Sequence, residues 1–560
     1  MVQQVAALSA QADYLVGGNQ RSAFNLGSAG PAANNGVIYY CVSANPFDGN
    51  GVNQLYARLI DRAFQYLENI TGIDFQKTTN ANLSDIDFTD NRAGAYAQTT
   101  DLGADGWTDS AVVNIDPNWY NGQATDANSG YIYQTILHEI LHTLGLDHMG
   151  PYNGNGSFAS DAIFVHDSWQ NSIMSYFSQA ENPNIRAAEA FLQTAMVVDL
   201  LALDLLYGTQ GFGGRSFGTS RAFTEDTVYG FNTTITEARD WTLSHLSQYA
   251  PSNAYCIVDG GGIDSFDFSG WSANQVINLT VSSAANPMPS VSSIGGGRGN
   301  LTLAVGTVIE NATGGSGHDQ ITGNFAANAL SGRAGNDTLN GGDGADTLSG
   351  GSGNDTYVTD GRDAIIEAAG GGFDTVRATG NITLAANIEA LTVAGSAAVA
   401  AIGNAQANHI TGNAAANRIN ALGGADTLVG AGGNDTVIGG GGRDVLSGGT
   451  GADRFEFRAV TDSVANLTGC DLITDFLSGV DMIDLSMIDA SALTAGDDAF
   501  VWRGQTAFGT GAEGEVRFQL SGSAGTASTV IYIDTDADST PEMVVRLSGH
   551  HALQATDFLL

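Results

Sequence analysis

The chain has 560 residues, which is more than one hydrophobic core can organise, so we expect several domains. It carries 59 acidic and 20 basic residues, which give a formal net charge of −39 at pH 7. A surface this acidic repels phosphate, and this argues against nucleic acid and anionic membrane surfaces as partners.

Residues 1–35 are small, polar and rich in Gly and Asn, which predicts a flexible leader or short propeptide. They contain no basic start followed by an apolar core, so we expect no classical secretory signal. No stretch of about 18 or more apolar residues occurs, so the sequence predicts no membrane span. The nearest candidate, Ala195 to Tyr207, is interrupted by Asp199 and Asp204 and is predicted to be a helix with a buried face.

The segment that follows alternates between strand and helix patterns, which is typical of an α/β domain. Apolar residues at helical spacing predict a helix from Val52 to Ile70 and another from about Tyr131 to Leu144. Strands are predicted at 36–43, 86–88, 95–98 and 112–115.

The second predicted helix carries the most specific chemical pattern of the chain, His-Glu-Ile-Leu-His-Thr-Leu-Gly-Leu-Asp-His at 138–148. His138 and His142 are four residues apart, so both rings project from one helix face and can share a metal ion. His148 can join them only if the helix ends first, and Gly145 permits the sharp reversal this requires. Glu139 lies one step round the helix, where it can act on a water activated by the metal.

This pattern is the metzincin zinc signature. The later segment Asn-Ser-Ile-Met-Ser-Tyr-Phe at 171–177 resembles the serralysin form of the turn that follows that signature. The resemblance implies that Met174 forms a hydrophobic floor beneath the imidazoles. It also implies that Tyr176 is a further zinc ligand, which can swing away and donate a hydrogen bond to the reacting oxyanion.

The order of elements over 36–212 is similar to the serralysin catalytic domain. This similarity implies one catalytic zinc, held by His138, His142 and His148, with Glu139 as general base in the hydrolysis of protein or peptide substrates. In that family the strand just before the active-site helix region lies at the edge of the sheet, where a peptide substrate can add by backbone hydrogen bonds.

From about residue 213 the helical periodicity disappears, and a β-rich segment is predicted over 213–313. Three stretches here resemble serralysins: 227–232, 259–270 and 308–317. In the second stretch, Asp259, Gly261 and Asp264 are candidate ligands of one calcium ion, and a simple Gly-rich turn is nearly as good an interpretation.

A nine-residue repeat occurs in two arrays within 314–457, the first through Asp355 and the second from Asn408 to Asp453. It has Gly at its first positions, Asp at the sixth and an apolar residue at the eighth. This is the calcium-binding nonapeptide of RTX proteins, which forms a parallel β-roll and here predicts several structural calcium ions. Asn replaces Asp at 328, 408 and 417, and Arg443 replaces a small residue, so these sites should be weaker or empty. Two repeats complete one coil, so Asp337 is expected to stack near Asp319 and Asp355. The candidate calcium residues of the repeats are Asp319, Gly332, Asp337, Gly341, Asp346, Gly350, Asp355, Asp426, Asp435, Asp444 and Asp453.

Between the two arrays, residues 356–401 alternate apolar and small residues and are predicted to continue the β structure. The run from Asp471 to Leu485 looks like the serralysin C-terminal β-sandwich, predicted over 458–560. The last four residues, Asp557-Phe-Leu-Leu560, resemble the uncleaved export signal of ATP-driven one-step secretion, which predicts a secreted, extracellular protein. The three cysteines form no metal or redox motif and are expected to be buried free thiols: Cys41, Cys256 and Cys470.

The predicted fold class is therefore a multidomain chain, in which an α/β metzincin catalytic domain is followed by an all-β parallel RTX β-roll and a β-sandwich. The predicted function is a secreted, monomeric zinc endopeptidase whose RTX domain folds with calcium. A small protein inhibitor and a cell surface stay open as further partners. The alternative is a calcium-dependent adhesive or surface-layer-associated protein with a vestigial protease domain. The intact set of histidines and Glu139 favours the enzyme, since decay usually removes one of these first.

Overall fold

The computed structural model describes residues 3–17, 23–27, 36–103, 106–120, 130–491, 498–509, 514–523, 526–536 and 538–560. The chain forms two compact units, Met1–Leu330 and Ser331–Leu560. The predicted border near residue 212 falls inside the first unit, because strand β10 (Asn253–Ile257) pairs in parallel with β6 (Phe191–Leu192). The β-rich segment after residue 213 therefore packs as part of the unit that contains the histidine helix.

A five-stranded sheet with the order β2-β1-β3-β5-β4 organises the start of the first unit. All its strand pairs are parallel except β4 with β5. The strands are β1 (Val37–Cys41), β2 (Asp74–Lys77), β3 (Ile86–Thr89), β4 (Tyr96–Leu102) and β5 (Thr108–Asn114). The prediction that the strand just before the histidine helix lies at the edge is wrong. That strand is β5, which is interior, and its hairpin partner β4 forms the edge.

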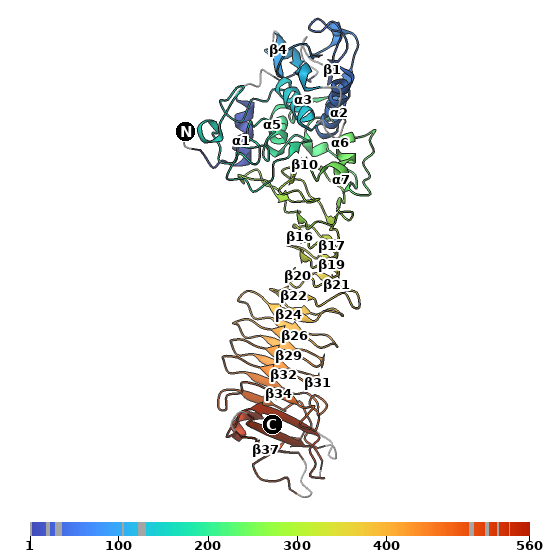
Figure 1. Cartoon of the computed structure of the whole chain (residues 1–560). Helices are drawn as coiled ribbons and strands as arrows, with labels where there is room; N and C mark the ends of the chain where they lie inside the picture. The colour runs from blue at the N-terminus through green and yellow to red at the C-terminus, as the bar shows by residue number, and fades with distance from the viewer. Residues whose placement is uncertain are drawn as a thin grey trace. The chain divides into compact units, whose positions relative to one another are not determined.

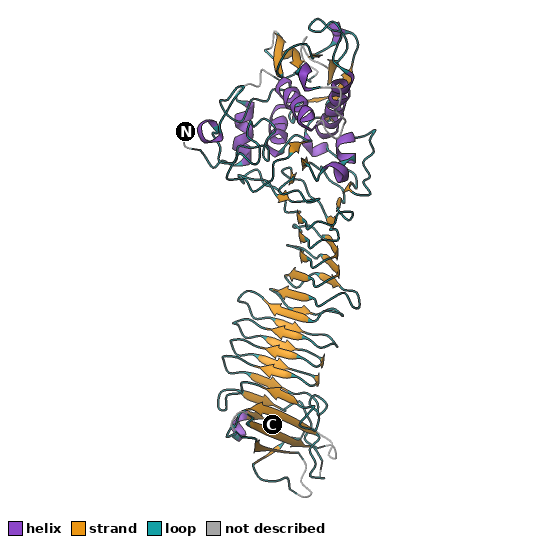
Figure 2. Ribbon diagram, viewed as in Figure 1, coloured by secondary structure: helices purple, strands orange, loops and turns teal. Residues whose placement is uncertain are grey.

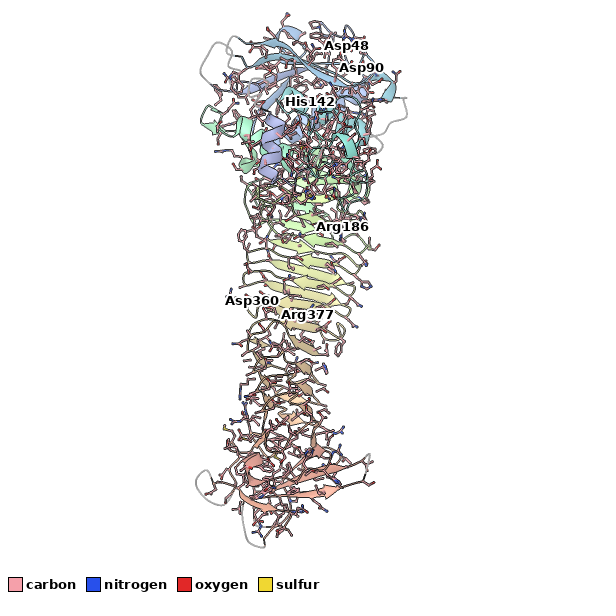
Figure 3. All side chains as sticks on the ribbon, turned by 90° about the vertical axis from the view of Figure 1, so that its left-hand side faces the viewer. Asp48, Asp90, His142, Arg186, Asp360 and Arg377 are labelled. Atoms are coloured by element: carbon pink, nitrogen blue, oxygen red, sulfur yellow. The ribbon has the colours of Figure 1, made fainter. Side chains whose placement is uncertain are left out.

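Two long helices pack near this sheet, α2 (Gln54–Thr71) and α3 (Gly130–Thr143), as Figure 1 shows. The Asn53 side chain accepts a hydrogen bond from the Tyr56 N–H and so caps the first turn of α2. Asp90 in turn accepts from the Asn53 N–H at 2.9 Å, and its own N–H donates to Asp48 at 3.2 Å. Asp48 and Asp90 lie close together in Figure 3, where they fix the start of this helix.

The predicted flexible leader is in part an ordered helix, α1 (Leu8–Val16). Its residues Leu8, Ala12 and Leu15 are fully buried, and the helix packs against α5 (Val197–Tyr207). The prediction of a flexible leader is therefore wrong for this helix, because burial of its apolar face orders it. Other residues of 1–35 lie outside the described part of the chain.

The remainder of the first unit is built from short elements. Short helices occur beyond residue 213, where the sequence predicted a β-rich segment without helical periodicity. Its helices are α4 (Phe158–Asp161), α6 (Trp241–Ser244) and α7 (Leu246–Tyr249), with 3₁₀ turns η2 (Ala81–Leu83), η3 (Pro117–Trp119) and η5 (Thr219–Arg221). Its further strands are β7 (Gly211–Phe212), β8 (Arg215–Ser216), β9 (Val228–Gly230), β11 (Ser265–Asp267), β12 (Val276–Asn278), β13 (Val291–Ser292), β14 (Leu301–Leu303), β15 (Asn311–Thr313) and β16 (Gln320–Thr322), and β17 covers Ala329–Ala334.

The second unit is a stack of short parallel strands, drawn in orange in Figure 2. Partners along the stack are often eighteen residues apart, as in His409↔Thr427↔Val445, so two nine-residue repeats do form one coil. One face contains β18 (Thr338–Asn340), β20 (Thr356–Thr359), β22 (Thr375–Ala378), β24 (Ala390–Val393), β26 (His409–Thr411), β29 (Thr427–Val429), β32 (Val445–Ser447) and β34 (Asp471–Ile473). Another sheet contains β23 (Ile382–Thr383), β25 (Ala400–Ile402), β27 (Arg418–Asn420), β30 (Thr436–Ile438), β33 (Arg454–Glu456), β35 (Met482–Asp484) and β40 (Phe558–Leu559). The remaining pairs are β19 (Thr347–Ser352) with β21 (Ala364–Ile366) and β28 (Gly423–Gly424) with β31 (Gly441–Gly442).

Each coil buries one apolar side chain per strand in a narrow core. Leu428, Val437 and Phe455 are fully buried, and each lies two residues after a repeat Asp. This confirms the parallel β-roll, since the repeat pattern predicted that the eighth position faces inward.

After the roll come β36 (Val501–Gly504), β37 (Glu515–Ser521), β38 (Ser528–Asp534) and β39 (Met543–Ser548), with a final 3₁₀ turn η6 (Ala555–Asp557). Strands β37, β38 and β39 pair antiparallel in sequence order, and β36 pairs in parallel with β37. Strand β39 pairs with β34, and β40 pairs with β35. The β-sandwich stays a prediction. All three cysteines are buried and free, as predicted, and no helix among the described residues is long and apolar enough to span a bilayer.

Candidate metal centre and active site

The three predicted imidazoles meet at one point. The Nε2 atom of His142 lies 3.1 Å from Nε2 of His138 and 3.0 Å from Nε2 of His148. His142, labelled in Figure 3, is on helix α3 together with His138. The helix ends directly afterwards, where Gly145 adopts φ +100° and the chain turns back to present His148.

The opposite ring nitrogens of two of these histidines are held by backbone carbonyls. Nδ1 of His138 lies 2.8 Å from the Ile173 carbonyl, and Nδ1 of His142 lies 2.7 Å from the Leu146 carbonyl. A neutral imidazole that donates from Nδ1 keeps the lone pair on Nε2. Burial, followed for His148 by the neighbouring His142, lowers the pKa of all three rings, that of His148 to about 3. The rings are therefore neutral and suited to bind a metal.

This donor set fits a zinc ion. Zinc takes imidazole nitrogens at about 2.0–2.1 Å in tetrahedral geometry, which places pairs of ligand nitrogens about 3.3 Å apart. The two Nε2–Nε2 separations, 3.1 and 3.0 Å, are within a few tenths of an ångström of that value. Three protein ligands leave one tetrahedral position open, which is typical of a catalytic rather than a structural site.

Glu139 lies beside this point and is 7% exposed. Burial raises the pKa of its carboxyl to about 8, and a hydrogen bond from the backbone of Ala97 on β4 acts in the opposite direction. The carboxylate lines cavities on both sides of the histidines. The structure therefore brings the Glu139 carboxyl to the histidine cluster, and its role as general base stays a prediction.

Met174 lies in a tight turn that is anchored from helix α5. The Asp199 carboxylate is fully buried and accepts hydrogen bonds from Ser172 Oγ at 2.5 Å and from the Ile173 N–H at 2.8 Å. The same group accepts from the Met196 N–H at 2.8 Å. Since the Ile173 carbonyl contacts His138, Asp199 positions the His138 ring through the Ile173 peptide. The sequence showed Asp199 only as an interruption of an apolar run.

We expect Asp199→Ala to destabilise the protein and to loosen the metal site. The substitution leaves three buried donors without an acceptor, and each such loss costs about 1–3 kcal/mol. Loss of an outer hydrogen-bond partner typically lowers metal affinity about 10-fold or more. Urea unfolding and zinc titration measure the two effects. Asp204→Ala on the same helix is the matched control, because Asp204 accepts from Thr219 and faces away from the turn. Equal zinc affinities in the two variants would contradict this role.

Tyr176 lies against the histidines, with its ring centroid 4.5 Å from that of His148. Its hydroxyl accepts a hydrogen bond from the Gly154 N–H at 3.3 Å. The hydroxyl is thus held by the backbone beside the cleft, and the ring lines the cavities on both sides of the site. Its assignment as a zinc ligand stays a prediction.

A cleft passes the histidines on both sides. A cavity of about 350 Å³ reaches from His138 and Glu139 to the aromatic rings of Trp119, Tyr131 and Trp169. A second cavity of about 430 Å³ lies between residues 95–99 and the segment from His142 to His148. Edge strand β4 borders this second cavity. The aromatic residues were not found from the sequence, because they come from separate loops and helices.

The predicted calcium ligands Asp259, Gly261 and Asp264 also lie near one another in the structure. Asp259 accepts hydrogen bonds from the Tyr229 hydroxyl at 2.6 Å and the Gly261 N–H at 2.9 Å, and burial raises its pKa. The Asp264 N–H donates to Glu310 at 2.7 Å, and the charge of Glu310 contributes to raising the pKa of Asp264, so a third carboxylate, missed in the sequence, lies near this pair. The cluster has the oxygen atoms that calcium prefers.

In several repeat turns the Asp side chain is held through one oxygen, whereas Asp319 accepts backbone hydrogen bonds on both, from Gln275 and Gly315. Oδ1 of Asp426 accepts from the Asn408 N–H at 2.6 Å, and Oδ1 of Asp435 accepts from the Asn417 N–H at 2.7 Å. Asp355 accepts in the same way from the N–H of Asp337, eighteen residues earlier, as predicted. Among the described residues, the second oxygen has no hydrogen-bond partner in Asp355, Asp374, Asp426, Asp435, Asp444, Asp453 and Asp471.

Glycine keeps the space next to these second oxygens open. A Cβ atom at Gly430, Gly439 or Gly448 would lie 2.3–2.4 Å from Oδ2 of the Asp five residues later. A row of buried, half-satisfied carboxylates beside open glycine turns fits calcium, which takes six to eight oxygens. The structure therefore supplies the donor set that the repeats predict.

In the repeat turn where Asn408 replaces Asp, side-chain amides donate hydrogen bonds to backbone carbonyls. The Asn408 amide donates to the Ile388 carbonyl at 3.0 Å, and the Asn404 amide donates to the carbonyls of Ala385 and Ile388 at 2.7 and 2.8 Å. These carbonyl oxygens are therefore satisfied by protein donors. The arrangement agrees with the prediction that Asn turns bind calcium weakly or not at all.

Comparisons with known proteins place the chain in a family. The family model described as Peptidase M10 serralysin C terminal matches residues 219–385 and 419–560, more than half of the chain. The chain is 39% identical over 240 residues to Metallopeptidase AprA of Pseudomonas marginalis, covering 42% of this chain and 45% of that protein. It is 40% identical over 209 residues to Serralysin C of Dickeya chrysanthemi, which covers 36% of this chain and 39% of that protein. It is 36% identical over 279 residues to Serralysin of Photorhabdus luminescens, which covers 47% of this chain and 51% of that protein.

The chain thus spans about half the length of the curated relatives it matches, or less. A solved R3 subunit of the mannuronan C5-epimerase AlgE6 from Azotobacter vinelandii is 33% identical, covering 28% of this chain and 80% of that one, with a TM-score of only 0.21. That score is too low to support an argument about the fold. The family model, by contrast, matches residues in both compact units. On this evidence, the chain belongs to the serralysin family of M10 peptidases.

Proposed function

We propose that this protein is a secreted zinc endopeptidase that hydrolyses peptide bonds within protein substrates. The observation that carries the proposal is the convergence of three neutral imidazole nitrogens beside a buried glutamate, in a cleft bordered by an edge strand. The names of the relatives, metallopeptidase and serralysin, support the same activity.

Zinc held by His138, His142 and His148 would activate a water molecule and polarise the scissile carbonyl. Glu139 accepts a proton from the attacking water and then delivers it to the leaving amine. The Tyr176 hydroxyl, released from Gly154, donates a hydrogen bond to the oxyanion. The carbonyls of Ile173 and Leu146 keep two rings in the required tautomer.

The substrate is expected to bind along β4 in extended form. Among the described residues, strand β4 pairs with β5 on one side only, so an extended peptide can add along its other edge. Residues 95–99 of this strand line the cavity next to Glu139 and His148. A peptide paired there has its backbone carbonyl within reach of the catalytic groups, and a large side chain can enter the aromatic pocket near Trp119.

We assign the repeat turns to structural calcium ions and couple their binding to export. Calcium is scarce in the cytosol, so charge repulsion keeps the repeats unfolded there, and binding outside stabilises the fold by mass action. The C-terminal segment supports this order of events. Asp557 is buried and accepts from Ser478 and Gly479, and Phe558 pairs within the sheet. An export signal at this position is exposed only before that part of the chain folds.

A casein assay tests the enzymatic proposal. Zinc-loaded, calcium-saturated protein should hydrolyse casein, and 1,10-phenanthroline should reduce hydrolysis to background because it removes zinc and leaves calcium in place. Added zinc should restore activity. Hydrolysis that is insensitive to this chelator would overturn the metal assignment. Absence of hydrolysis in the zinc-loaded protein would favour the adhesive alternative.

A further inference from the structure

A separate cluster of carboxylates lies in the second unit, outside the nine-residue repeats. Asp534 ends strand β38, and Asp536 and Glu542 follow in the connection to β39. One oxygen of each carboxylate lies within 4.8 Å of the other two. Nothing in the repeat pattern predicts this group, because its residues are spaced by two and six positions and lack the repeat glycines.

The Asp534 side chain shows that this cluster is more than an acidic surface. It is fully buried, with 0% of its surface exposed. Its Oδ1 accepts a hydrogen bond from the Asp536 N–H at 3.1 Å, whereas its Oδ2 has no hydrogen-bond partner among the described residues. Burial first, and then the charges of Glu542, Asp536 and Asp538, raise the pKa of Asp534 to about 6. A buried carboxylate oxygen without a partner is costly, and a cation between the three groups would offset that cost.

The spacing of the acidic residues in this loop also matches a known type of calcium loop. Asp534, Asp536 and Asp538 alternate along the chain, and Ser539 then adopts φ +66°, a left-handed conformation that reverses the loop. Calcium loops of the EF-hand type use the same spacing at their first, third and fifth ligands and a left-handed glycine at the sixth position. Glu542 is held in place by the Thr535 N–H at 2.7 Å.

The chemistry of the donors selects the ion. All available side-chain ligands are carboxylate oxygens, which suit a hard divalent cation and not zinc, for which imidazole and thiolate are typical. Magnesium needs near-ideal octahedral geometry and retains several waters, whereas calcium accepts an irregular set of six to eight oxygens. An irregular loop with three or four carboxylates therefore matches calcium best.

We propose that Asp534, Asp536 and Glu542, with Asp538 as a further ligand, bind one calcium ion that holds the β38–β39 hairpin closed. Strand β38 pairs on one side with β37 and on the other with β39, which itself pairs with β34 of the roll. An ion at this turn consequently stabilises the strands that terminate the roll. The site is independent of the zinc centre and of proteolysis.

Hydrogen exchange of the full chain, followed by mass spectrometry across a calcium titration, tests this site locally. Asp536→Asn is the central variant. Asn can still accept the bond that Asp536 Oδ1 takes from the Asp538 N–H at 2.9 Å, so only the charge is lost. We expect the calcium midpoint for protection of the β38–β39 peptides to rise at least 10-fold, with the midpoint for the repeat peptides unchanged. Asp489→Asn is the matched control, because exposed Asp489 accepts similar backbone bonds from Ser491 and Asp498 outside the cluster.

Metal analysis gives a second measurement that does not depend on the hairpin peptides. After gel filtration in calcium buffer, Asp536→Asn should contain one calcium ion fewer per chain than the wild type and Asp489→Asn. Asp534→Asn should behave like Asp536→Asn, which guards against a folding defect particular to one variant. An unchanged midpoint, or an unchanged calcium content in both cluster variants, would overturn the proposal.

Discussion

Replacing Glu139 by glutamine is expected to leave zinc bound and to lower kcat/KM for casein by roughly 10²- to 10⁴-fold, the range typical of a lost general base. Glutamine has nearly the same shape as glutamate, so the cleft and the Nε2 atoms of the three histidines stay in place. It cannot accept the proton of the attacking water, however. Because Glu139 is itself buried, the neutral side chain should also not reduce the free energy of unfolding.

Metal analysis and initial-rate kinetics on the same preparation check this result. Glu68→Gln provides a matched control: Glu68 is also a helical glutamate whose pKa is raised by burial, but it lies on α2 outside the cleft. The control should keep wild-type kcat/KM. If the zinc-loaded Glu139→Gln protein retains proteolysis, the assigned role is wrong.

Removal of calcium is expected to unfold the roll at neutral pH. Without the ions, buried carboxylates such as Asp426, Asp444 and Asp471 follow one another along the stack. Burial raises the pKa of each, and the charge of Asp444 further raises those of Asp426 and Asp471. Each site that calcium occupies at about 100 times its Kd stabilises the fold by about 2.7 kcal/mol. Loss of several sites therefore removes a free energy comparable to the roughly 5–15 kcal/mol that typically stabilises a domain.

Far-UV circular dichroism with a calcium chelator, followed by re-addition of calcium or magnesium, measures this transition. Calcium should restore the β signal and magnesium should not. Asp435→Asn should weaken calcium binding, because Asn keeps the Oδ1 acceptor for the Asn417 N–H and loses the charge. Asp360→Asn is its matched control: Asp360, labelled in Figure 3, contacts Arg362 and lies outside the Asp positions of the repeats. A spectrum that the chelator does not alter would contradict calcium-dependent folding.

The stacking in the roll was predictable because the pattern is local and repeated. A fixed period of nine residues places Asp435 one coil from Asn417 and Asp453 whatever the rest of the chain does. The same is true of the helix that carries His138 and His142, since four residues make about one helical turn. Asp199, Glu310 and Asp534 were missed because their partners are set by packing between distant segments or by a loop that no repeat describes.

The position of β4 at the edge of the sheet also could not be predicted from the sequence. The sequence predicted short strands near β4 and β5, but a local strand pattern carries no information on which strand has a neighbour on both sides. Only the tertiary structure decided that β5 lies between β3 and β4, which leaves β4 as the edge beside the cleft. Likewise, polar composition predicted a flexible leader, whereas burial of Leu8 and Leu15 against α5 orders part of it.

The sequence by itself thus determined the elements whose chemistry repeats at short range: the histidine helix with its glycine stop, the nonapeptide turns and their inward apolar residues. The tertiary structure alone decided which carbonyls orient the rings, which carboxylate anchors the turn at Met174, and which aromatic residues shape the cleft. The physical reason is that spacing along a helix or coil is set by backbone geometry, whereas contacts between distant segments depend on how their buried faces pack.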